Sequence, residues 1–336
     1  MLLKKPFIKI FIAISKIMVL CIFISCGSTS MNSEYSLSEH SNADNTALDI
    51  LCDESTEAIQ VFRTGEDEPI LVHNTKQDFR PYIHPILAPD GQGELTEFSP
   101  GHHLHQTGLY WGFTQVNGRD FFHHPEGDYW QRVSVEIIEE TAANHSHGES
   151  IQERENIGSE TVQWKSVFDL LGEDGNAILR ETQKWSMEEE NGKFILDLEW
   201  QGDAKTDITI GEFDYGGLFL RMPWSEGVPT EVINSENDQN QQAERQRAKW
   251  LNLGMHVEGR DDLAQIAIFD HPENNGFPTT WRVDGQFGVG LSRAIMGDWH
   301  IKEGGTEVIR HRLIIYTDKF DVQVLTKAWQ DYTNDH

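Results

Sequence analysis

The sequence predicts an all-β protein, built as a large antiparallel β-sandwich with few short helices. Segments of alternating apolar and polar residues follow one another from about residue 50 to the C-terminus, and this period-two pattern marks strands with one buried face. Short sequences containing Gly, Asn and Asp separate the segments and indicate tight turns. Hydrophobic residues make up 38% and aromatic residues 10% of the 336 residues, which suffices for a substantial core.

The clearest strand segments are rich in β-branched and aromatic residues. They are 58–63, 132–138, 161–168, 194–200, 264–269 and 308–316. The turn sequences are 89–91, 116–119, 173–176 and 190–193. Because no repeat and no internal linker interrupt this series, the sequence predicts one β domain over residues 50–336. A mutarotase-like supersandwich is one architecture of this class.

Two segments depart from the strand pattern. Residues 239–249 (QNQQAERQRAK) form either one short helix or a polar loop, and residues 324–332 are predicted to form a terminal helix. Helices therefore contribute little to the expected fold.

The first 25 residues predict a lipoprotein signal peptide. Three lysines precede an apolar run over residues 10–24, and Cys26 follows a small residue at the expected cleavage point. We expect cleavage before Cys26 and attachment of lipid such as palmitate there. A single membrane anchor is the alternative interpretation, although Lys16 breaks the apolar run, which is short for a span of about 20 residues.

The Ser- and Asn-rich residues 26–49 predict a flexible tether between the lipid and the domain. The expected location is the periplasm or outer membrane of a Gram-negative bacterium, with the lipid anchor as the only membrane contact. Once the signal peptide has left, Cys52 is the one cysteine besides Cys26, so no intramolecular disulfide is available within the domain.

The chain is strongly acidic. It has 27 Lys and Arg against 55 Asp and Glu, a formal net charge of −28. Such a surface repels phosphate backbones, and no basic patch stands out in the sequence, so nucleic acid is excluded as a partner. The sequence also lacks dinucleotide, P-loop, serine-hydrolase and zincin motifs.

Histidine is the residue type that stands out, with 15 in the chain. The densest segment runs from 99 to 113 (SPGHHLHQTGLYWGF). If it is extended, His103 and His105 share one face. Two imidazoles on one face are compatible with three roles. They can supply a general base and an orienting donor, they can bind a divalent metal, or they can form a structural pair at the edge of the core. No cofactor is predicted, and a metal held by His103 and His105 stays an alternative.

Blocks spread over about residues 60–332 resemble the bacterial "methane oxygenase PmoA-like" family and occur in its order. They are Arg80–Tyr82 with His84-Pro85, His103–Leu109, Val116–Phe121, Asp214–Arg221, Ala248–Trp250, and Phe269–Asn274 with Pro278 and Trp281. His103, His105, Gly108 and Leu109 keep the residue types of the family, whereas their neighbours differ, so the chain resembles a subgroup. The resemblance implies a secreted or lipid-anchored protein of carbohydrate degradation, and some relatives are associated with dehydration of uronate-ended oligosaccharides.

The residues in these blocks suggest roles in such chemistry. His103, His105 and Tyr215 are the candidate catalytic acids and bases, and the planar forks of Arg221 and Arg80 suit a sugar carboxylate. The other candidate substrate-binding residues are His123, Trp111, Trp281 and His271. Trp111 and Trp281 offer flat faces for sugar rings. Asp270 and His271 form either an acid–base pair or a turn.

Three functional classes follow from these residues. The first, which we favour, is a carbon–oxygen lyase (a dehydratase) that removes water from the uronic acid end of an oligosaccharide, by proton abstraction alpha to the carboxylate. The second is a glycoside hydrolase, which typically needs two opposed carboxylates. The third is a non-catalytic sugar-binding lipoprotein. In each class the expected partner is an oligosaccharide.

Overall fold

The computed structural model describes residues 45–101, 103–138 and 155–334, which belong to one compact unit. The predicted signal peptide, Cys26 and its lipid lie outside the described residues, as does His102. Strand β1 (Asn45–Thr46) and the start of β2 (Leu48–Asp53) fall within residues 26–49. The segment predicted as a tether therefore ends earlier than expected, because its last residues pair with the sheets.

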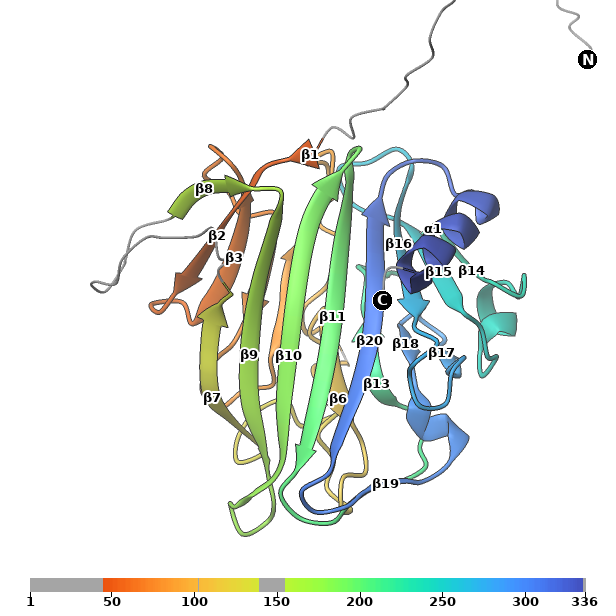
Figure 1. Ribbon diagram of the computed structural model, residues 1–336. Coiled ribbons are helices and arrows are strands. Elements are labelled where there is room, and N and C mark those ends of the chain that lie inside the picture. Colours follow the sequence, from red (N-terminus) through yellow and green to blue (C-terminus); the bar gives the residue numbers. More distant parts are fainter. Residues whose placement is uncertain (1–44, 102, 139–154, 335–336) are drawn as a thin grey trace, which may run out of the picture. The chain divides into compact units, whose positions relative to one another are not determined.

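One sheet, here called the short-strand sheet, has the antiparallel order β17-β18-β13-β6-β5-β4-β3-β2-β8 (Figure 1). Apart from β2, its strands are β3 (Ala58–Arg63), β4 (Leu71–Asn74), β5 (Tyr82–Ile86), β6 (Leu109–Phe113), β8 (Glu155–Ser159), β13 (Gly216–Leu220), β17 (Trp281–Val283) and β18 (Val289–Leu291).

The second sheet, here called the long-strand sheet, has the order β14-β15-β16-β20-β11-β10-β9-β7, and β1 pairs with β10. Its strands are β7 (Trp130–Ile137), β9 (Thr161–Leu171), β10 (Ala177–Glu190), β11 (Lys193–Ala204), β14 (Thr230–Asn234), β15 (Trp250–His256), β16 (Leu263–Asp270) and β20 (Thr306–Tyr316). All the predicted strands are present, so the antiparallel β prediction is confirmed.

The remaining elements are short. Strands β12 (Ile208–Ile210) and β19 (Trp299–Ile301) pair with each other. Of the segment 239–249, only Asn240–Ala243 is helical, as the 3-10 helix η1; a second one, η2, covers Arg293–Met296. The predicted terminal helix is α1 (Val322–Asn334).

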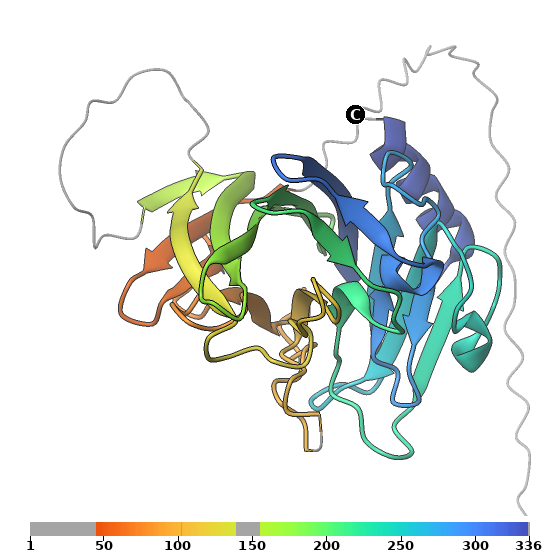
Figure 2. The same ribbon diagram turned by 90° about the horizontal axis from the view of Figure 1, so that it is seen from below.

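The two large sheets pack face to face around the main core (Figure 2). Strand β11 shows why its sequence suits this position. Phe194, Leu196 and Trp200 alternate into the core, and the Trp200 ring stacks on Trp111 of β6 with centroids 4.8 Å apart. The alternate residues face outward, where Asp197 and Glu199 form ion pairs with arginines of β20.

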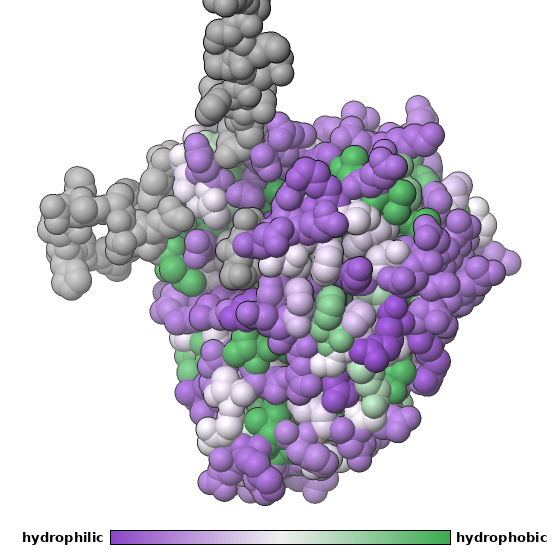
Figure 3. All heavy atoms as spheres, turned by 45° about the vertical axis from the view of Figure 1, so that its right-hand side comes forward, coloured by the Kyte–Doolittle hydropathy of each residue, from purple (hydrophilic) through white to green (hydrophobic). Residues whose placement is uncertain are grey.

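Helix α1 covers the outer face of the long-strand sheet. Its Leu325 and Tyr332 pack with Trp250 of β15 and Phe269 of β16 in a second, smaller core cluster. The face of the molecule seen in Figure 3 is mainly polar, and its apolar residues form small separate patches. Within the described ranges, no helix has both the length and the apolar character that a membrane crossing requires.

Candidate functional site

A layer of aromatic side chains lies on the outer face of the short-strand sheet. Because neighbouring strand residues point to opposite faces, Tyr110 of β6 points outward while Leu109 and Trp111 pack in the main core. The layer, called here the aromatic layer, consists of Phe79, Tyr82, Tyr110, Phe122, Tyr215 and Phe219. Its rings touch, with centroids of Tyr110 and Phe219 5.5 Å apart and those of Phe122 and Tyr215 5.0 Å apart.

His103 and His105 lie beside this layer in the connection between β5 and β6. The segment is not extended, because the His103 amide donates to the Pro100 carbonyl and the Gln106 amide donates to the His103 carbonyl. The two imidazoles still come together, with ring centroids 5.9 Å apart. The chain enters β6 through Gly108, where φ is +81° and a Cβ atom would lie 2.5 Å from the Ile83 carbonyl oxygen, so only glycine fits.

Arg80 holds the β5–β6 connection in place through hydrogen bonds to backbone carbonyls. Its guanidinium is buried and donates to the carbonyls of His105 at 2.6 Å and Phe122 at 2.5 Å. Burial lowers the pKa of Arg80 to about 10, which leaves it charged at neutral pH. This geometry does not support the prediction that Arg80 binds substrate, because its buried guanidinium is occupied by backbone carbonyls of the segments that carry the histidines. Arg80 positions the site instead.

His123 forms the best-oriented acid–base group of the cluster. Its Nδ1 lies 2.8 Å from the Asp120 Oδ2, and Asp120 Oδ1 also accepts the amides of Phe122 and His123 at 3.0 Å. Partial burial raises the pKa of Asp120, but these hydrogen bonds outweigh it, so the pKa lies below the ordinary value. The ionised carboxylate requires a proton on Nδ1, which leaves the lone pair of His123 on Nε2.

His105 faces this pair. Its ring packs edge-to-face on His123 with centroids 4.6 Å apart. Burial is the largest cause that lowers the pKa of His105 to about 3, and its interactions with His123 and Arg80 act in the same direction. The imidazole is therefore neutral at physiological pH, and it offers one donor and one acceptor to a ligand rather than a strong base.

Tyr215 closes the cluster on the other side of His123, with ring centroids 5.8 Å apart. Its phenol oxygen accepts a hydrogen bond from Arg282 Nη2 at 3.2 Å. The next two residues, Gly216 and Gly217, have φ of +153° and +133°, and a Cβ on Gly217 would lie 2.2 Å from the Leu291 carbonyl. These glycines allow β13 to pack against β18, and they serve the sheet rather than ligand approach.

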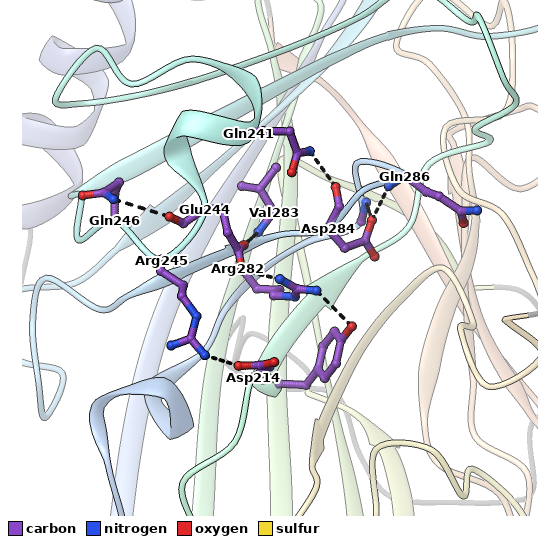
Figure 4. A network of polar contacts seen from close by, with 11 residues as sticks. Asp214, Gln241, Glu244, Arg245, Gln246, Arg282, Val283, Asp284 and Gln286 are labelled. Atoms are coloured by element: carbon purple, nitrogen blue, oxygen red, sulfur yellow. Dashed lines mark hydrogen bonds and ion pairs between the residues drawn. The ribbon is translucent and has the colours of Figure 1, made fainter.

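Charged residues extend the site beyond Tyr215, as Figure 4 shows. Arg282 of β17 forms an ion pair with Glu244, whose other carboxylate oxygen accepts the Val283 amide at 2.5 Å. Arg245 forms an ion pair with Asp214, the residue before Tyr215. Arg282, Glu244 and Arg245 could not be predicted, because nothing in the sequence pattern distinguishes them from the chain's other charged residues.

Arg221, the predicted ligand of the sugar carboxylate, is buried. Its side chain is 2% exposed and donates to the backbone and side-chain oxygens of Gln286, with Glu97 3.6 Å away. The predicted binding of a sugar carboxylate by Arg221 is therefore not supported, because Gln286 already accepts hydrogen bonds from its guanidinium group.

Trp111, Trp281 and His271 are also buried, so this geometry does not support their predicted contact with substrate. Trp111 lies between the sheets, and the Trp281 indole donates to the Ala248 carbonyl. His271 packs on Tyr332 of α1. Asp270 accepts hydrogen bonds from the Thr279 amide and the Asn274 side chain, and burial raises its pKa to about 6. This segment is a buried turn, the second of the two interpretations.

Exposed apolar side chains border the cluster. Phe98 is 42% and Phe213 37% exposed, and their rings lie 5.3 Å from Tyr82 and 6.2 Å from Tyr215, respectively. Leu104, between the two histidines in sequence, is 67% exposed. Polar groups rimmed by flat apolar faces are typical of sugar-binding surfaces.

Metal binding finds no support in this arrangement. Among the side chains that the structure describes, no three His, Cys, Asp or Glu residues converge as metal ligands. A cavity of about 280 Å³ lies elsewhere, between the β10–β11 hairpin, the end of β20 and α1, and none of the predicted site residues lines it.

Fold and site together define an all-β sandwich protein with a histidine–tyrosine–arginine cluster on the outer face of one sheet. Residues 62–330 match the profile of the family described as "Family of unknown function (DUF6807)". The chain belongs to this family. The resemblance to methane oxygenase PmoA-like proteins, which goes beyond this family match, stays a prediction. No curated protein matches the sequence.

Solved structures with distant similarity include the GH36 alpha-galactosidase AgaB from Geobacillus stearothermophilus, with a TM-score of 0.42 and 10% identity over 80% of this chain and 41% of that one. AgaA from the same organism, in complex with stachyose, has a TM-score of 0.36 and 11% identity over 82% and 41%. A TPR-domain containing protein from Parabacteroides distasonis has a TM-score of 0.34 and 7% identity over 79% and 48%. The chain thus spans less than half the length of each neighbour, and no activity follows from these similarities.

Proposed function

We propose that the protein is a carbohydrate-active lyase that removes water from the uronic acid end of an oligosaccharide. The observation that carries this proposal is the Asp120–His123 pair, whose imidazole ring lies beside the ring of Tyr215. A dehydration needs a base at the carbon alpha to the carboxylate and an acid at the departing hydroxyl. The cluster offers both without a cofactor.

His123 is the proposed base. Asp120 holds the proton on Nδ1 and stabilises the imidazolium that forms when Nε2 takes a proton from carbon. The sequence analysis placed His123 among the substrate-binding residues and His103 and His105 among the catalytic ones. With its pKa near 3, His105 suits hydrogen bonding to the sugar better than proton abstraction.

Tyr215 is the proposed acid. Its oxygen accepts from Arg282, so its own proton is available to the departing 4-hydroxyl. The guanidinium beside it stabilises the phenolate that remains. The carbon–hydrogen bond and the carbon–oxygen bond break, one water leaves, and a carbon–carbon double bond conjugated to the carboxylate forms. Solvent then returns the proton from His123 to Tyr215.

The alternative of a glycoside hydrolase fits this geometry less well. Of the carboxylates that border the cluster, Asp120 is held by His123 and Glu244 by Arg282, which leaves Asp214, in an exposed ion pair with Arg245, as one carboxylate that could become free. Hydrolysis by the common mechanism requires two carboxylates free to act on the glycosidic bond.

Mass spectrometry of uronate-ended and neutral oligosaccharides incubated with the protein tests the proposal. We expect loss of one water from the uronate-ended substrates alone, with new near-ultraviolet absorption from the conjugated acid. His123→Ala should lower turnover by about 10²–10⁴-fold, the usual contribution of a positioned base. Gain of one water would instead establish a hydrolase, and an unchanged mass would favour a binding protein.

His124→Ala is the matched control, because the neighbouring His124 is exposed and stacks on Tyr129 outside the cluster. It should keep full turnover. Dialysis against EDTA should leave activity unchanged, whereas loss restored by a divalent ion would reassign His103 and His105 as metal ligands. Equal activity of the wild type and His123→Ala would refute the assignment of the base.

A further inference from the structure

Basic side chains gather beside Tyr215 although the chain has a net charge of −28. Arg282 reaches this place from β17, and Arg245 follows η1 (Figure 4). Both have acidic partners, Glu244 and Asp214 respectively. The two ion pairs differ in exposure, and this difference decides which arginine is open to a ligand.

The Arg282–Glu244 pair is a fixed part of the protein. Their side chains are 19% and 21% exposed, and the pair is tied to its surroundings by the Val283 amide and the Tyr215 hydroxyl. Separating such charges is costly, because each would lose its partner away from bulk water. Arg282 therefore remains with Tyr215.

The Arg245–Asp214 pair is open to solvent, with side chains 52% and 49% exposed. Exposed ion pairs contribute little to stability, so a competing anion displaces one partner at low cost. The basic residues that follow Arg245 in sequence contact other parts of the protein. Arg247 donates to the carbonyls of Gly276 and Pro278, and the ammonium group of Lys249 lies over the ring of Trp329.

The backbone also presents Arg245 in an unusual way. Its φ is +62°, a left-handed conformation that non-glycine residues seldom adopt, and its amide donates to the Trp281 carbonyl at 2.8 Å. The neighbouring strand thereby fixes the position of Arg245 relative to Arg282. Such conformations persist where the surrounding structure imposes them, and they concentrate at functional sites.

We propose that Arg245 is the residue that selects an acidic sugar, and that the sugar carboxylate displaces Asp214 from its guanidinium. This inference rests on the proposed function and gives it a specificity residue that replaces Arg221 and Arg80. A planar guanidinium binds a carboxylate through two parallel hydrogen bonds, which a neutral hydroxymethyl group does not offer. Asp214 keeps the site from capturing small anions when no sugar is bound.

Calorimetric binding of a uronate-ended disaccharide and of its neutral counterpart tests this selection. In Arg245→Gln we expect about 10-fold weaker binding of the acidic sugar, the loss typical of one charge-assisted contact, and unchanged binding of the neutral one. In Asp214→Asn the acidic sugar should bind several-fold more tightly, because the competing carboxylate is gone.

Lys302→Gln is the matched control, because it removes a cation from another exposed ion pair, that with Asp207; it should change neither affinity. Wild-type affinity for the acidic sugar in Arg245→Gln, or weaker affinity in Asp214→Asn, would overturn the inference. Because binding is measured independently of turnover, the experiment tests the selection by Arg245 separately from the lyase activity. Selective binding without loss of water refutes the lyase alone, and loss of water with an unaffected Arg245→Gln refutes the role of Arg245 alone.

Discussion

Arginines near the aromatic layer differ in what their guanidinium groups contact. Arg80 and Arg221 are 1% and 2% exposed, and their donors meet protein oxygens. Arg245 is half exposed and meets one carboxylate. A planar guanidinium group can donate hydrogen bonds equally well to the backbone of a buried loop and to a substrate. The residue type alone therefore does not identify a ligand, and burial has to be known.

Glu181 of β10 provides a prediction about stability and pH. It is buried between the sheets, where the Trp200 indole and the Gln183 amide donate to its two oxygens. Burial raises its pKa from 4.5 to about 7 despite these bonds. The folded state therefore binds the proton more tightly than the unfolded state. The resulting stabilisation is complete below pH 4.5 and is lost as the pH rises to about 7.

We predict that Glu181→Gln removes this dependence. The free energy of unfolding of the variant, relative to the wild type, should increase by up to about 3 kcal/mol between pH 4.5 and 7.5. Urea unfolding at a series of pH values measures it. Glu231→Gln, on the exposed surface of β14, is the control and should give a constant difference. A constant difference for Glu181→Gln as well would contradict the raised pKa.

At the scale of elements, the β10–β11 hairpin shows how a short sequence determines a connection. Asn191 and Gly192 both have positive φ, +51° and +70°, as a type I′ turn requires. This turn matches the twist of the paired strands and sets the register in which Glu190 faces Lys193. Since no atom lies within 4 Å of a Cβ built on Gly192, only the backbone conformation demands glycine there.

Gly192→Ala should accordingly lower the free energy of unfolding by about 1–2 kcal/mol, the cost of a left-handed conformation for a residue with a side chain. Thermal unfolding followed by circular dichroism measures the effect. Gly285→Ala is the control, because Gly285 also has open space around its Cβ but no positive φ. Its stability should stay close to that of the wild type. Equal effects of the two substitutions would show that backbone conformation is not the cause.

The strands could be predicted from sequence because their burial repeats every second residue, as in β11, where every other side chain is in the core. The β5–β6 connection could not, because its shape depends on distant partners. Arg80 and Gly108 hold it in place through contacts with Phe122 and Ile83, and alternation carries no such information. The high density of histidines in the sequence indicated the histidine cluster, whereas no sequence pattern indicated its neighbours Arg245 and Arg282.

At the scale of the whole molecule, negative charge and substrate chemistry oppose each other. The net charge of −28 repels an acidic sugar at long range. Ion pairs leave this excess unchanged, as on the outer face of the long-strand sheet, where Asp197 and Glu199 meet Arg312 and Arg310. The arginines beside Tyr215 act only within a few ångströms, so encounter and final binding respond differently to salt.

This difference leads to a prediction for ionic strength. The Debye length falls from about 30 Å at 0.01 M salt to about 10 Å at 0.1 M, so long-range repulsion is screened first, while direct contacts, much shorter than the Debye length, are screened less. The kcat/KM for a uronate-ended substrate should therefore rise several-fold over this range. Steady-state kinetics at constant pH measures it, and binding of a neutral oligosaccharide should stay constant. A fall in kcat/KM would instead show that the local arginines dominate the approach of the substrate, and that the −28 charge is too far from the site to oppose it.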